Sequence, residues 1–117
     1  SYATIAELIE RAKELQHEDE RTKALGLSEE ELAFYDILAA KKELIKVEGP
    51  IQDIVHGVVK AVKSNLQLDW AKKENAKAAI RLAVKKELRG KISITQLNEI
   101  LQEIMLQAEG QFGEWSA

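Results

Sequence analysis

The chain has no cysteine among its 117 residues, which excludes disulfide bonds, thiolate metal ligands and a cysteine nucleophile. Apolar runs are also short: none approaches the length of a membrane span, and the N-terminus lacks the pattern of a signal peptide. A chain without cysteine suits a reducing compartment, so we expect a cytoplasmic protein. Methionine occurs once, at Met105, and we therefore expect the chain to be a piece of a longer protein.

Apolar residues recur at steps of three and four along the chain, which predicts an all-α protein. We expect one helical domain over residues 1–117, a bundle of about five helices with residues 110–117 as a flexible tail. A chain of this length can bury a core without a metal or a disulfide. The expected helices cover residues 3–24, 28 to about 47, 50–66, 69–89 and the region that begins at Ser93 or Thr95.

Helix-start signals support this division. Ser28 and Glu31 have the spacing of a capping box, in which each side chain accepts a hydrogen bond from the other residue's backbone N–H. Asp69 is expected to cap the fourth helix, and Ser93 with Gln96 is expected to form a second capping box. Gly49 and Pro50 interrupt the helical pattern between the second and third helices.

The first expected helix carries an apolar stripe at helical spacing, followed by a strongly polar end. We expect residues 16–23 of this helix to fray or project. The stripe consists of Ile5, Leu8, Ile9, Ala12 and Leu15. The corresponding core face of the last helix consists of Leu97, Ile100, Leu101, Ile104 and Ala108.

The net charge is only −3, but the charges are segregated. Residues 1–48 carry a balance of −5, residues 71–91 carry +6, and residues 92–117 carry −4. A basic helix between acidic segments either pairs with them inside the fold or faces an anionic partner.

Catalytic motifs are nearly absent. The sequence has no phosphate-binding loop, no dinucleotide-binding glycine pattern and no His-Glu-x-x-His motif. His17 and His56 lie far apart in sequence, and no residue is indicated as the nucleophile or orienting carboxylate of a general base. The acidic runs at 18–20 and 29–31 do not form a shaped loop for a divalent cation. We therefore expect no catalysis, no cofactor and no metal site in this chain.

The basic helix and the aromatic residues near the C-terminus are the strongest candidates for a binding surface. Basic residues every four positions form a slanting band on a helix, which is compatible with a phosphate-binding surface, a solvated or internally paired face, or a protein interface. The two aromatics either fold back on the core or anchor a partner. The candidate partner-binding residues are Lys73, Lys77, Arg81, Lys85, Arg89, Phe112 and Trp115.

Two segments carry a more specific signal. The first is Leu-Gly-Leu-Ser-Glu-Glu-Glu-Leu-Ala-Phe-Tyr-Asp at residues 25–36. The second begins at Asp69-Trp70 and continues through Lys72, Lys73, Glu74, Arg81, Leu82, Val84, Lys85 and Lys86.

Together and in this order, the two segments resemble the C-terminal helical region of the restriction (motor) subunit of type I restriction–modification enzymes. The resemblance implies a parent subunit that uses ATP and Mg and cleaves DNA after translocation, with the nuclease and motor domains upstream of this region. It further implies that the helical region docks the motor onto the methyltransferase–specificity core, with the methyltransferase subunit as its partner. Sequence-independent contact with the DNA backbone through the basic helix is the alternative.

Overall fold

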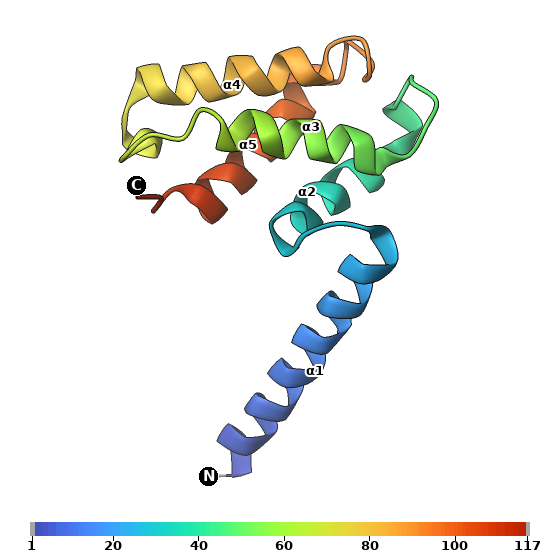
Figure 1. The fold of residues 1–117 in the computed structure, drawn as a ribbon, viewed down its shortest axis with the longest axis vertical. Helices are drawn as coiled ribbons and strands as arrows, with labels where there is room; N and C mark the ends of the chain where they lie inside the picture. Colours follow the sequence, from blue (N-terminus) through green and yellow to red (C-terminus); the bar gives the residue numbers. More distant parts are fainter. Residues whose placement is uncertain (1, 117) are drawn as a thin grey trace.

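The structure is a computed structural model that describes residues 2–116, and it confirms the all-α prediction. Residues 2–116 contain five α-helices and two short 3-10 turns, which follow α2 and α3, and no β-strand; only isolated bridges are found in this range. Figure 1 shows the helices as they lie in space. The α-helices are α1 (Tyr2–Leu25), α2 (Glu29–Ala39), α3 (Ile51–Lys63), α4 (Glu74–Leu88) and α5 (Leu97–Phe112), and the turns are η1 (Lys42–Leu44) and η2 (Trp70–Lys72).

Helices α2 to α5 form a packed body. Helix α3 lies between α2 and α4, and α5 packs against both α2 and α4 (Figure 1). Their apolar faces meet in one core, which includes the fully buried Trp70 of η2. Each of the four helices contributes to it, for example through the buried side chains of Leu38, Val58, Ile80 and Ile104.

Helix α1 extends away from this body as an arm (Figure 1). Its C-terminal end is the attached end: the Arg21 guanidinium hydrogen-bonds to the Asp36 carboxylate of α2, and Thr22 is buried. The Thr22 hydroxyl donates to the backbone carbonyl of Asp19 at 2.8 Å. Residues 16–20 project with the arm, as one of the two expectations had it. The other expectation, fraying of residues 16–23, was wrong, since this polar stretch stays helical and its end contacts α2.

Helix α2 ends at Ala39, about eight residues earlier than expected, and the reason is long-range backbone pairing. Residues 45 and 92 form an antiparallel bridge. The Lys46 N–H donates to the Lys91 carbonyl at 2.8 Å, and the Ser93 N–H donates to the Leu44 carbonyl at 3.0 Å. The loop after α2 is thus hydrogen-bonded to the loop after α4. This pairing takes the place of the last helical turns that were expected for α2.

Two predicted helix starts were wrong. Asp69 adopts a left-handed conformation (φ 57°) before η2 and makes no capping hydrogen bond through its side chain, so α4 begins only at Glu74. Ser93 and Gln96 form no capping box, and α5 begins at Leu97. At its other end α5 extends to Phe112, so residues 110–112 belong to the helix and not to the expected tail.

Candidate partner-binding surface

The surface position of the basic band follows from the core face of α4. Ala76, Ile80, Val84 and Leu88 are buried at steps of four. The basic residues follow each of them by one position, about 100° around the helix, and therefore come to the surface beside the core face. Arg81 and Arg89 are exposed, while Lys77 and Lys85 are half-buried. Lys73 is exposed just before the first turn of α4.

Lys77 is committed to a contact inside the fold. Its Nζ atom lies 3.0 Å from Glu109 Oε1 of α5. The hydrogen bond to Glu109 and the negative charge of that residue raise the pKa of Lys77 above its ordinary value. Of the roles that the sequence left open for the band, internal pairing therefore accounts for Lys77.

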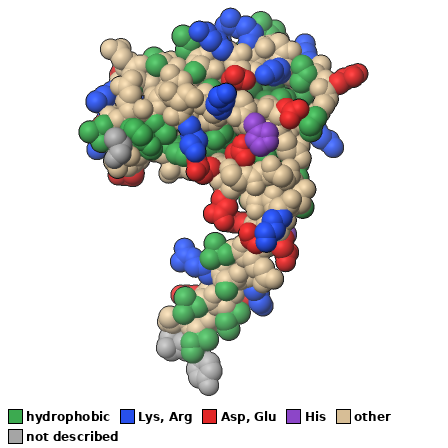
Figure 2. Space-filling model, viewed as in Figure 1, with side chains coloured by type: hydrophobic (Ala, Val, Ile, Leu, Met, Phe, Trp, Pro, Cys, Tyr) green, Lys and Arg blue, Asp and Glu red, His purple; other side chains and the backbone are tan. Residues whose placement is uncertain are grey.

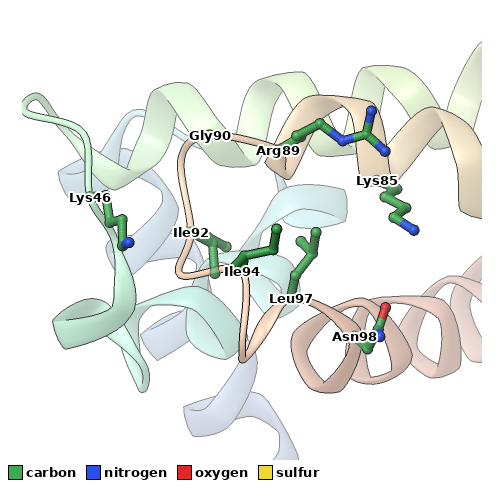
Figure 3. Close-up of a pocket in the computed structure, with 8 residues that line it drawn as sticks. All are labelled: Lys46, Lys85, Arg89, Gly90, Ile92, Ile94, Leu97 and Asn98. Atoms are coloured by element: carbon green, nitrogen blue, oxygen red, sulfur yellow. The ribbon is translucent and has the colours of Figure 1, made fainter.

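Arg81, Lys85 and Arg89 are different, because none of them forms an ion pair with another residue in the range 2–116. Lys85 and Arg89 also line a surface pocket of about 440 Å³ that extends to Lys46. In Figure 3, Ile92, Ile94 and Leu97 lie together in the middle of this region, with Lys46 on one side and Lys85 on the other.

Lys46 belongs to this pocket although sequence reasoning did not select it. It lies about forty residues before Lys85 and Arg89 in the sequence and reaches the pocket only because the Lys46 N–H pairs with the Lys91 carbonyl. A long-range backbone contact of this kind leaves no local sequence signal.

Exposed apolar side chains accompany the unpaired cations. Leu82 of α4, Leu106 of α5 and Ile94 of the connecting loop are all exposed, and Ile94 lines the same pocket as Lys85. Cations interspersed with accessible aliphatic side chains resemble the mixed surface of a protein interface more than a surface that contacts phosphates alone.

The two candidate aromatics occupy different environments. Phe112 packs against the core, and its carbonyl accepts hydrogen bonds from the indole N–H of Trp70 at 2.8 Å and from the backbone N–H of Trp115 at 3.0 Å. Phe112 thus folds back on the core, the first of the two alternatives that the sequence left open. Trp115 is half-buried.

A second group of ionisable residues lies at the start of α2. The predicted capping box is confirmed: the Ser28 N–H donates to Glu31 Oε1 at 2.9 Å, and Glu31 Oε2 also contacts Nδ1 of His56. Burial alone would raise the pKa of Glu31, but hydrogen bonds from Ser28 and His56 outweigh burial and lower it. The Ser28 hydroxyl is engaged in the cap, so the group has the geometry of a helix start and not of an activated nucleophile.

Within residues 2–116 no cluster of three or more histidine or acidic side chains is arranged to hold a metal ion. Nor is any helix of that range long and apolar enough to cross a membrane.

Comparison with known proteins assigns the chain to one family. Residues 1–114 match the family described as "Type I restriction enzyme HindI endonuclease subunit-like, C-terminal". A Methanocaldococcus jannaschii protein named as a type I restriction enzyme MjaIXP endonuclease subunit is 39% identical over 89 residues, which cover 69% of this chain and 8% of that protein. The type I restriction enzyme HindI endonuclease subunit of Haemophilus influenzae is 29% identical over 85 residues, which cover 71% of this chain and 8% of that protein.

The chain thus spans less than a tenth of the length of these relatives. No solved structure matches it significantly.

Proposed function

The chain belongs to the C-terminal family of type I restriction enzyme endonuclease subunits, and from this premise we propose that it is a non-catalytic assembly domain. In this proposal it docks the subunit onto the methyltransferase–specificity core of a cytoplasmic restriction enzyme. ATP and Mg serve the nuclease and motor activities of the parent subunit, which belong to the rest of that protein.

The observation that supports docking is the part of the basic band that forms no ion pair within the described chain. Arg81, Lys85 and Arg89 form no ion pair with a described residue. Exposed Leu82 lies on the same helix, and exposed Ile94 lines the pocket of Lys85 and Arg89. An anionic partner surface with apolar patches would be complementary to this arrangement.

Charge reversal at Arg81 tests the proposal in the full-length subunit. We expect Arg81→Glu to weaken binding to the purified methyltransferase–specificity core about tenfold, equivalent to about 1.4 kcal/mol, measured by titration at physiological salt. Arg81 is the better choice than Lys77, because reversing Lys77 would also break its contact with Glu109.

Lys86→Glu is the matched control. It makes the same change of charge on an exposed residue of the same helix, roughly 140° around from Arg81. Equal affinities for the two variants would reject the band as the docking surface, provided that both keep the helical circular dichroism of the parent protein.

A second candidate, contact with the DNA backbone, is favoured by the cations of the pocket in Figure 3, Lys46, Lys85 and Arg89. It predicts sequence-independent binding by the full-length subunit that falls steeply with salt and whose salt slope decreases by about one when Arg89 is replaced by alanine. A salt slope unchanged in Arg89→Ala would eliminate this role for the pocket.

A further inference from the structure

Helix α1 carries an apolar stripe that nothing in the described chain covers. Ile5, Leu8, Ile9 and Leu15 are 56%, 63%, 51% and 62% exposed. In fact every described side chain from residue 4 to residue 20 is exposed. Figure 2 shows hydrophobic side chains gathered along the arm, away from the body.

The body does not cover the stripe. At about 100° per residue, the centre of the stripe lies roughly 130° around the helix from the centre of the face formed by Arg21, Thr22 and Leu25, although Leu15 at one edge lies only about 20° from Thr22. Every described side chain from residue 4 to residue 20 is exposed, so the covering surface must come from elsewhere.

An uncovered arm of this length is unfavourable. A helical segment of about 15 residues without tertiary contacts is marginal in water, and four large aliphatic side chains in solvent forgo the free energy of burial. A surface that covers the stripe would stabilise both the helix and the contact.

A second copy of the chain offers too little area to be that surface. Four side chains that each expose on the order of 100 Å² supply about half of the roughly 800 Å² per partner that a stable interface buries. The stripe cannot be prolonged either, because the residues that follow it, His17 to Glu20, are all polar or charged.

A surface on the same polypeptide chain as α1 does not need the full area of a stable interface between separate molecules. The matched region is described as C-terminal, and more than nine-tenths of each relative lies outside it. In such a subunit the preceding polypeptide is covalently joined to α1 and faces it at an effective concentration in the millimolar range, so a small apolar contact suffices.

We propose that the apolar stripe of α1 docks into an uncharged apolar groove on the part of the same subunit that precedes it, and so fixes the body to the rest of the subunit. This inference goes beyond the proposed function, because it concerns another surface and does not depend on the basic band of α4.

The test uses the full-length subunit alone, with the photo-crosslinking residue benzoylphenylalanine at position 8 and, as a matched control, at position 14. Glu14 lies on the polar side of the same helix, roughly 120° from Leu8. We expect irradiation to link position 8, and not position 14, to peptides upstream of α1 within one subunit, with a yield that does not change on dilution.

Three results would overturn the proposal. Crosslinked species of twice the subunit mass would indicate a second copy. Crosslinks at position 8 that form only after the methyltransferase–specificity core is added would assign the stripe to that partner. Equal yields from positions 8 and 14 would show no preferred contact. Because the expected crosslink needs no methyltransferase–specificity core, failure of the α4 docking proposal would leave this test intact.

A second readout keeps the proposal testable if the crosslinker perturbs the helix. In the full-length subunit, Leu8→Asp should accelerate hydrogen exchange of the amides of residues 4–16 at least tenfold and leave the amides of α3 unchanged. Exchange that is already fast in the parent subunit and unaffected by Leu8→Asp would show that α1 is uncovered.

Discussion

Helices α1 and α5 carry apolar residues at the same three- and four-residue spacing, yet they have opposite environments. In α5 the apolar side chains, including Ile100, Leu101 and Ile104, are buried against α2 and α4. In α1 the equivalent side chains are exposed over most of the helix. The comparison shows that periodicity identifies the face of a helix that needs a partner, while the presence of that partner depends on the rest of the fold.

The largest effect should come from the covered helix. Ile104 is fully buried, so Ile104→Ala should lower the free energy of unfolding by about 2–5 kcal/mol through lost transfer free energy and the cavity that remains. Chemical denaturation followed by circular dichroism measures this. A decrease in the free energy of unfolding of less than 1 kcal/mol would mean that α5 is not a core helix. The difference in burial between α5 and α1 would then not hold.

A smaller effect, dependent on pH, is expected at Glu31, near the junction of α1 with the body. The folded state lowers the pKa of Glu31 below its ordinary value of 4.5, so the carboxylate stabilises the fold above that value. This contribution is lost as the pH falls through the folded-state pKa.

Glu31→Gln should therefore lower the free energy of unfolding by about 1 kcal/mol at neutral pH, since the charge-assisted hydrogen bonds weaken. The difference between parent and variant should shrink below pH 4.5 and vanish once Glu31 is protonated in both states. A difference that stays constant with pH would show that the Glu31 charge does not stabilise the junction.

The smallest effect is expected in α1. Leu8 is mostly exposed, so Leu8→Ala in the domain should change the free energy of unfolding by no more than about 0.5 kcal/mol. The same denaturation measurement applies, with Ile104→Ala as its internal comparison. A loss of 2 kcal/mol or more would show that the stripe is already buried in the domain and would contradict the structure of the arm.

Short-range sequence signals predicted the fold class, the capping box at Ser28 and the core face of α5. The end of α2 was not predictable, because Ile45 leaves the helix to pair with Ile92, a contact between residues far apart in sequence. Asp69 has the chemistry of a helix cap but also tolerates a left-handed conformation, which it adopts before η2.

The candidate surface was predictable only in part. The four-residue spacing placed Arg81 and Lys85 on one side of α4, since helical geometry alone determines this. It could not show that Lys77 pairs with Glu109 or that Lys46 joins the pocket, because both depend on how separate elements pack.

The most direct test of the account is co-elution of the full-length subunit with the purified methyltransferase–specificity core at physiological salt, with and without DNA. The docking role predicts a complex that forms without DNA and is weakened by Arg81→Glu but not by Lys86→Glu. Retention only when DNA is present would contradict the docking role and assign the unpaired cations to the nucleic acid.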